Sequence, residues 1–336
     1  MHHFGQKTLL FIKPSLPIFP LILKAQEKRY NILVISAHDS LGTLPEEIIN
    51  TFSVFFQVDT DDDRAVLELV KKISQKFHID GVIPGDTYAM PLTYKVAIYL
   101  KKPKISPEVM RRLKTHMIAI PYSQKVEPRE AFKDALKTLK IDYSVQVLIQ
   151  NNVLSIVSIT EKIVLSEQDF LEIGVIVCSE NDPSLVKTIE SYLKKVIMAL
   201  HLNNGPFHMD VRLVEQRPLL VDISIGFVES AISNLIRQAS GIDLYDNILR
   251  LFSGQPLLLQ GTKRLTAGLI FCYSSRELET LRDNSYVKEL IVYDKGVDVR
   301  LPMKSKVGHA LLVHEDDQVL RHQMAEASVL ARSFNA

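Results

Sequence analysis

Apolar residues in the first hundred positions form short runs that alternate with helical patterns. The runs lie at Leu9–Ile12, Ile32–Ile35, Val54–Val58 and Gly81–Pro84. Arg64–Phe77 instead repeats apolar residues at the spacing of one helix face, and Asp61, Asp62 and Asp63 precede it as capping carboxylates. Strands that alternate with helices in this way predict a parallel, doubly wound sheet.

Farther along, the pattern changes to strands that return on themselves through polar turns. The predicted elements are a hairpin over Tyr143–Gln150 and Val153–Ile159, a helix over Pro183–Leu202, a second hairpin over Phe207–Val214 and Pro218–Ile225, and two helices that end at Gly241 and Gly254. The last stretch mixes strands over Leu265–Tyr273, Glu289–Tyr293, Val297–Leu301 and Ala310–His314 with a final helix over Asp316–Ser333. A charged helix is expected over Val109–Lys140, ahead of the first hairpin.

The second hairpin carries the candidate chemistry. Alternation places His208, Asp210 and Arg212 on one face of the first strand. If residues 215–217 form a three-residue loop, Asp210 falls directly opposite Asp222. Two facing carboxylates repel each other unless a divalent cation lies between them, and Mg²⁺ is commonly held by one or two carboxylates. The alternative is a water-facing surface on which Asp210 pairs with Arg212 or meets solvent.

Composition narrows the functional classes. The chain has 336 residues, enough for two or three domains, and a formal net charge of +1, which argues against nucleic-acid and membrane-surface binding. Cys178 and Cys272 are the only cysteines and lie in apolar runs, which favours a reducing, cytoplasmic setting. The apolar stretch 8–23 contains Lys13 and three prolines, so it predicts neither a membrane span nor a signal peptide.

An ordered set of segments resembles the ATP-grasp ligases, most closely the carboxylate–amine ligases. The segments are GPFHMDVRL with Gly205, His208 and Asp210, PLLVDISIGF with Asp222 and Ser224, the trio Gly241, Ile242 and Asp243, and upstream Glu161, Lys162, Glu172 and Gly174. The resemblance implies an α/β protein with a Rossmann-like N-terminal domain over residues 1–106. It also implies an ATP-grasp-like α+β domain with a truncated lid over 107–260 and a small C-terminal α+β cap over 261–336.

The same resemblance implies a nucleotide site. Mg²⁺ would lie on Asp210 and Asp222, with weak ATP binding. The nucleotide- or substrate-binding candidates are His208, Arg212, Ser224 and Lys162. A structural histidine is the alternative for His208, an exposed strand lysine is the alternative for Lys162, and no catalytic residue is assigned.

Departures from the family pattern are equally informative. No glycine occurs between Gly85 and Gly174, so comparison with the family pattern predicts that the glycine-rich phosphate loop, its lysine and the adenine hinge are deleted. Aspartates replace both expected glutamates, Ser224 replaces an asparagine, and Ile225-Gly226 replaces a proline-arginine pair. No glycine fingerprint supports dinucleotide chemistry.

Two hypotheses about function stay open. One is a ligase with a weakened nucleotide site, acting on a small carboxylate or amine and needing Mg²⁺ for nucleotide binding. The other is an inactive relative that serves as a binding or regulatory partner. Either protein is compatible with a homodimer or a protein partner. The glycine-free stretch also predicts that the first hairpin packs without the usual mobile lid.

Overall fold

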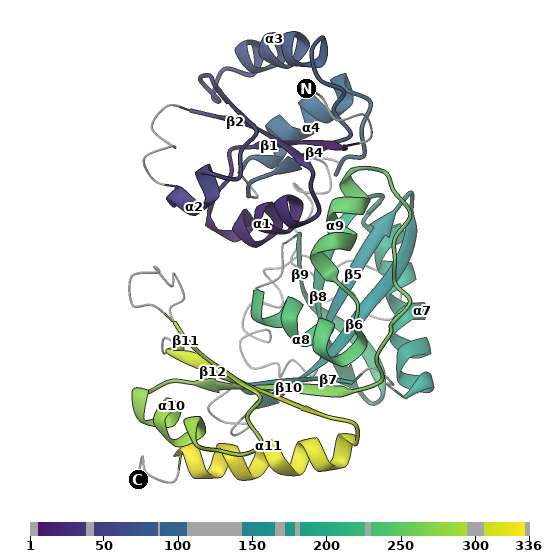
Figure 1. Cartoon of the computed structure of the whole chain (residues 1–336). Coiled ribbons are helices and arrows are strands. Elements are labelled where there is room, and N and C mark those ends of the chain that lie inside the picture. Colours follow the sequence, from purple (N-terminus) through teal and green to yellow (C-terminus); the bar gives the residue numbers. More distant parts are fainter. Residues whose placement is uncertain are drawn as a thin grey trace.

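A computed structural model of the chain describes residues 6–37, 44–86, 88–105, 143–164, 172–178, 182–225, 230–293 and 306–332. The described residues form two sheets, a four-stranded one near the N-terminus and an eight-stranded one that reaches the C-terminal helix (Figure 1). The helix expected over Val109–Lys140, the truncated lid and the strand expected over Val297–Leu301 lie outside these ranges. Within the described residues, no helix combines the length and apolar character of a membrane span.

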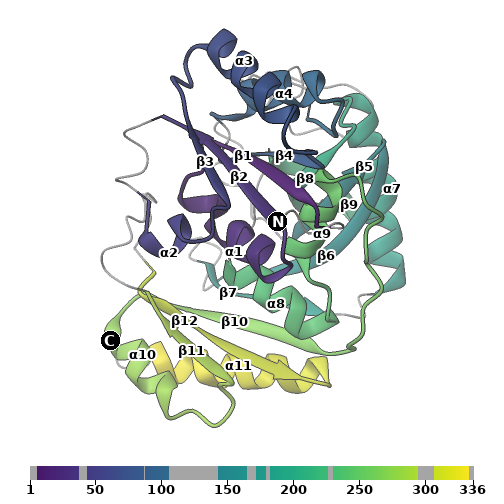
Figure 2. The same ribbon diagram turned by 45° about the horizontal axis from the view of Figure 1, so that its top comes forward.

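The N-terminal sheet is parallel, as its sequence pattern predicts. Its elements are β1 (Thr8–Ile12), η1 (Leu16–Ile18), α1 (Phe19–Glu27), β2 (Asn31–Ser36), α2 (Glu46–Ile49), β3 (Val54–Gln57), α3 (Asp63–Ser74), β4 (Gly81–Pro84) and α4 (Met90–Tyr99). The strand order is β3-β2-β1-β4, and every described pairing is parallel. Helices α1 and α2 cover one face and α3 and α4 the other (Figures 1 and 2).

Capping by an aspartate fixes where α3 begins. The Asp62 carboxylate accepts hydrogen bonds from the backbone amides of Arg64 and Ala65, which lack partners inside the helix. Val66, Val70 and Ile73 then point into the core at helical spacing. The helix is therefore set by the aspartate run and the apolar stripe that the sequence displays.

The second sheet is antiparallel and contains the strands of both the middle and the C-terminal regions. Its elements and their helices are β5 (Tyr143–Gln150), β6 (Val153–Val164), β7 (Glu172–Cys178), α7 (Pro183–Ala199), β8 (Gly205–Val214), β9 (Arg217–Ile225), α8 (Ser230–Ser240), α9 (Leu244–Phe252), β10 (Thr266–Cys272), α10 (Ser275–Arg282), β11 (Glu289–Val292), β12 (Gly308–His314) and α11 (Asp317–Arg332). The strand order is β11-β12-β10-β7-β6-β5-β8-β9. The C-terminal strands thus extend the central sheet, because β10 pairs with β7.

The β8–β9 hairpin has a shorter turn than predicted, but the predicted pairing of Asp210 with Asp222 is present. Val214 pairs with Arg217, so the loop has two residues, Glu215 and Gln216, and both have positive φ angles of 49° and 62°. A β-bulge then inserts Val221 between the pairs, and Asp210 still lies opposite Asp222. The predicted three-residue loop was wrong. Arg217 belongs to β9, and Val221 in the bulge is the additional residue that keeps Asp210 opposite Asp222.

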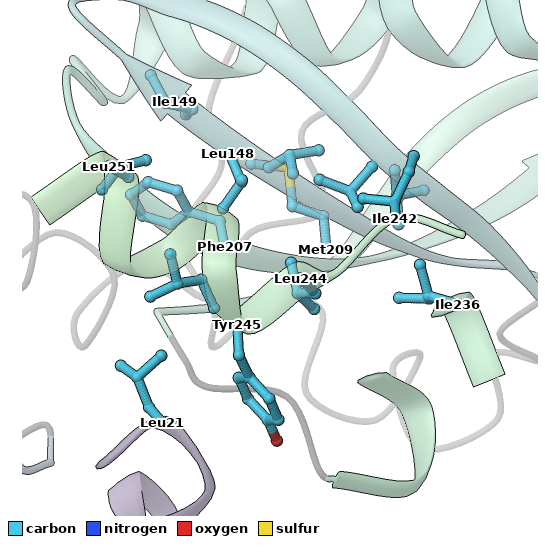
Figure 3. Close-up of a cluster of buried hydrophobic side chains, with 14 of the residues drawn as sticks. Leu21, Leu148, Ile149, Phe207, Met209, Ile236, Ile242, Leu244, Tyr245 and Leu251 are labelled. Carbon is cyan, nitrogen blue, oxygen red and sulfur yellow. The ribbon is translucent and has the colours of Figure 1, made fainter. Parts of the chain in front are cut away.

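A continuous apolar core joins the N-terminal domain to the second sheet. Figure 3 shows Phe207 and Met209 of β8 in a cluster with Leu244 and Leu251 of α9, next to Leu21 of α1. Because side chains alternate along a strand, this packing directs His208, Asp210 and Arg212 to the opposite face of the sheet. Core packing of one face therefore positions the polar residues of the other.

Candidate functional site

Eight polar side chains lie in two rows across four adjacent strands. The first row pairs Asp222, Asp210, Ser144 and Thr160 on β9, β8, β5 and β6, and the second pairs Ser224, His208, Gln146 and Ser158 on the same strands. Directly opposed residues point to the same face of a sheet. We call these eight residues the polar grid. It is most buried on β5 and β6 and opens toward β9, the edge strand, where Ser224 is exposed.

Asp210 is the most heavily bonded member of the grid. Its Oδ1 atom accepts a hydrogen bond from Ser144 Oγ at 2.5 Å and lies 3.2 Å from His208 Nε2 and 3.3 Å from Lys162 Nζ. Burial alone would raise the pKa of Asp210, but His208, Lys162 and Ser144 together outweigh burial and lower this pKa to about 2. Asp210 is therefore a carboxylate whose negative charge is already shared inside the protein.

His208 connects the two rows of the grid. Its Nδ1 atom contacts the side-chain amide of Gln146, and its Nε2 atom faces Asp210. If the amide donates to Nδ1, the ring proton lies on Nε2 and is shared with the carboxylate. Both ring nitrogens are then engaged, so His208 orients Asp210 instead of presenting a free nitrogen to a ligand.

Lys162 lies over the grid from the end of β6. Its side chain is only 15% exposed, and its ammonium lies between Asp210 Oδ1 at 3.3 Å and Glu172 Oε2 at 3.9 Å. The alternative that Lys162 is an exposed strand lysine is therefore wrong, because its side chain is mostly buried and its ammonium lies near two carboxylates. Both contacts are longer than the 2.7–2.9 Å typical of a charge-assisted hydrogen bond.

The other predicted site residues lie at the open side of the grid. Asp222 is partly buried opposite Asp210, and Arg212 is partly buried two residues farther along β8. The described contacts of Asp210 are with Lys162, His208 and Ser144, so the alternative in which Asp210 pairs with Arg212 is not what the structure shows. The structure thus brings His208, Asp210, Asp222, Ser224 and Lys162 together on one face.

Two hydroxyls of the grid lack hydrogen-bond partners among the described residues. They belong to Ser158 and Thr160, whose exposed fractions are 7% and 1%. A buried hydroxyl without a partner costs free energy, so such groups are uncommon and often mark a place where water or a ligand binds. The two grid hydroxyls on β6 therefore lack described hydrogen-bond partners, whereas Asp210 on β8 has several.

Sequence reasoning missed the half of the grid that lies on the first hairpin. Ser144 and Gln146 alternate with apolar residues in YSVQVLIQ, and Ser158 and Thr160 alternate in VSIT, so the polar stripe is visible in the sequence. What the sequence does not display is that β5 pairs with β8. The contact of Ser144 with Asp210 spans 66 residues and depends on that pairing.

The predicted Mg²⁺ site meets its donor requirement only in part. Two facing carboxylates are oxygen ligands that suit Mg²⁺. Lys162, however, already lies against Asp210, and within the described part of the chain no three His, Cys, Asp or Glu side chains gather at a spacing suited to a metal. As arranged, these residues do not fit a resident divalent cation. Whether the two carboxylates point into a cleft stays a prediction.

Comparison with known proteins identifies solved structures that share the fold of this chain. No protein-family model matches the sequence, and no curated protein matches it. Solved structures do match, and the L-amino acid ligase from Bacillus licheniformis has a TM-score of 0.67 at 16% identity, with 97% of this chain and 98% of that chain covered. The N5-carboxyaminoimidazole synthase from Aspergillus clavatus, in complex with ADP and 5-aminoimidazole ribonucleotide, has a TM-score of 0.65 at 13% identity, with 97% and 99% covered.

A third match is phosphoribosylglycinamide synthetase from Anaerococcus prevotii, with a TM-score of 0.63 at 11% identity and with 97% of this chain and 98% of that chain covered. These proteins are ATP-grasp enzymes, and the match runs through the whole chain. At such low identities the likeness shows the fold alone. The fold predicted from the ordered motifs is confirmed, with its parallel N-terminal sheet and its antiparallel second sheet.

Proposed function

From the ATP-grasp fold and the polar grid, we propose that this chain is a carboxylate–amine ligase of the ATP-grasp type with an altered nucleotide site. The observation that carries the proposal is the contact of Asp210 with Lys162 at 3.3 Å, on the face where Asp210 also lies opposite Asp222. A buried lysine and paired carboxylates in a strand-borne grid are costly for stability alone, and perturbed pKa values such as that of Asp210 cluster at functional sites.

The proposed reaction follows the resemblance to the ligase family. A substrate carboxylate attacks the γ-phosphorus of ATP, which gives an acyl phosphate and ADP, and an amine then attacks the acyl carbon and releases phosphate. In this chain, Lys162 and Arg212 would hold anionic groups by charge. His208 and Ser144 would keep Asp210 in place, and Ser224 would donate a hydrogen bond at the open edge. No step is assigned to Mg²⁺, because Lys162 already lies against Asp210.

Nucleotide binding is expected to be weak. The sequence has no glycine between Gly85 and Gly174, and comparison with the family pattern predicts that the phosphate loop, its lysine and the adenine hinge are missing. Losing three charge-assisted hydrogen bonds, at about 1.5–3 kcal/mol each, turns a micromolar site into a millimolar or weaker one. Among the described residues, the contacts proposed for the nucleotide are those on the grid.

Calorimetric titration with ATP and with ADP tests this proposal. We expect dissociation constants in the millimolar range. Trapping with hydroxylamine during incubation with ATP and a panel of small carboxylic acids would then reveal an acyl phosphate as a hydroxamate. Low-micromolar binding would contradict the account of the missing loop, and no hydroxamate despite measurable binding would contradict ligase activity.

A second candidate function has its own support. The absence of glycine between Gly85 and Gly174 favours an inactive relative that binds a ligand or a protein without catalysing ligation. If the chain is such an inactive relative, no nucleotide binding should be detected even at millimolar nucleotide concentrations. A small carboxylate or amine substrate, a homodimer or protein partner, and a cytoplasmic location stay predictions for both candidates.

A further inference from the structure

The resemblance to the ligase family implies a metal ion on Asp210 and Asp222, and in this structure the ammonium group of Lys162 lies 3.3 Å from the Asp210 carboxylate. We infer that the ammonium of Lys162 takes the place of that ion beside Asp210, so that the grid excludes divalent cations and binds the phosphoryl group of its ligand without one. The inference rests on the proposed ligand site but not on ligase activity. Its evidence is the contacts of the Lys162 ammonium with Asp210 and Glu172.

The geometry leaves little room for both cations. Mg²⁺ binds oxygen at about 2.0–2.1 Å. Lys162 Nζ lies 3.3 Å from Asp210 Oδ1, so a metal on the same oxygen would be at most about 5.4 Å from the ammonium. Like charges this close, on a lysine only 15% exposed, repel strongly because little water separates them. A metal on the other carboxylate oxygen would still meet a charge shared with Lys162 and His208.

Charge balance points the same way. Asp210 and Glu172 are both in contact with the ammonium of Lys162, and Asp222 lies opposite Asp210. Removing Lys162 would leave Asp210 facing Asp222 with no ammonium in contact with it. That arrangement of facing carboxylates is the one that attracts a divalent cation.

Lys162 is also equipped to hold an anion. It has three N–H donors, and its two described contacts, at 3.3 and 3.9 Å, are longer than good charge-assisted hydrogen bonds. A phosphoryl oxygen would accept from this ammonium at a shorter distance. The hydroxyls of Thr160 and Ser158, which have no partner among the described residues, belong to the same strand and the same face.

The decisive experiment measures Mn²⁺ binding by electron paramagnetic resonance, without any nucleotide. Full-length wild type, Lys162→Met, Lys162→Gln, Asp210→Asn and the double variant Lys162→Met/Asp210→Asn are compared. We expect no binding to wild type at millimolar Mn²⁺, binding at least tenfold tighter to either single variant, and loss of that gain in the double variant. Lys162→Gln removes the charge but keeps a polar side chain that is one atom shorter than lysine, so it covers the case in which the methionine variant does not fold.

Two results would overturn the inference. One is Mn²⁺ binding to wild type that Asp210→Asn abolishes, because Lys162 would then not exclude the ion. The other is the absence of binding in both folded Lys162 variants, because Lys162 would then not be the group that keeps the ion out. Inorganic triphosphate, titrated with and without EDTA, provides the matching anion measurement, and its binding to wild type is expected to be the same in both. Neither measurement depends on catalysis, so a failed ligase assay leaves them interpretable.

Discussion

Two lysines in this molecule are each held between two carboxylates, and they differ in how tightly. Lys24 of α1 lies 2.5 Å from Glu27 and 2.9 Å from Asp243, whereas Lys162 lies 3.3 Å from Asp210 and 3.9 Å from Glu172. Their side chains are almost equally buried, at 11% and 15% exposed. Burial alone therefore does not distinguish the two clusters.

One partner of Lys24, Asp243, also caps a helix, whereas no helix cap is described for the partners of Lys162. Asp243 caps α9 by accepting a hydrogen bond from the amide of Asp246, and its pairing with Lys24 joins the N-terminal domain to that helix. Burial alone would raise the pKa of Asp243, but this amide and Lys24 lower it. The Lys24 cluster thus consists of close contacts, whereas the Lys162 cluster has longer contacts and unsatisfied neighbours, which is why we propose it as the ligand site.

The largest expected effect comes from breaking the Lys24 cluster. Asp243→Ala removes a helix cap and leaves a buried lysine with one partner, so the free energy of unfolding should fall by about 3 kcal/mol. Asp182→Ala is the matched control, because Asp182 caps α7 at an exposed position and should cost only about 1 kcal/mol. Urea denaturation measures both, and equal losses would show that the pairing of Lys24 with Asp243 contributes nothing.

The pH dependence of stability tests the charge on Asp210. Its folded-state pKa of about 2 lies below the unfolded value of 3.8, so its ionisation stabilises the fold above pH 4, and this stabilisation is lost as the pH falls toward 2. The contribution is about 2 kcal/mol at pH 7 and roughly half of that at pH 3. Urea denaturation of wild type and Asp210→Asn from pH 3 to 7 should show a difference that shrinks on acidification. A difference independent of pH would contradict the assigned contacts.

A smaller effect separates the two lysines directly. Lys24→Met should cost about 2 kcal/mol, because it removes the ammonium that lies between the carboxylates of Glu27 and Asp243 at a domain contact. Lys162→Met should cost only about 1 kcal/mol, because Asp210 keeps its bonds from Ser144 and His208. Thermal unfolding at fixed pH compares them. A greater loss for Lys162→Met would mean that the Lys162 cluster is in fact a structural one.

The smallest effect is expected at the unsatisfied hydroxyls. Thr160→Val keeps the shape of the side chain and removes a buried group without a described partner, so stability should stay within about 0.5 kcal/mol of wild type or rise slightly. Ser144→Ala, the control, removes a bond to a charged carboxylate and should cost about 1.5–3 kcal/mol. A comparable loss for Thr160→Val would show that its hydroxyl has a partner.

Patterns within one element were predictable, and pairings between distant elements were not. The strand-helix alternation and the Asp62 cap follow from local spacing, and they appear as expected in the four-stranded sheet. The facing of Asp210 and Asp222 also follows from local alternation, although the bulge at Val221 replaces the longer loop. Lys162 lies 48 residues earlier in the chain than Asp210, so only the assembled sheet brings their charges together.

Binding of ATP in the presence of EDTA is the most direct test of the central claim, that the Lys162 cluster is a ligand site that needs no divalent cation. Calorimetry would compare wild type, Lys162→Met and Lys24→Met, each with and without added Mg²⁺. The account predicts weak binding to wild type that Mg²⁺ does not strengthen, loss of this binding in Lys162→Met, and its retention in folded Lys24→Met. Binding that requires Mg²⁺, or binding that survives unchanged in Lys162→Met, would contradict it.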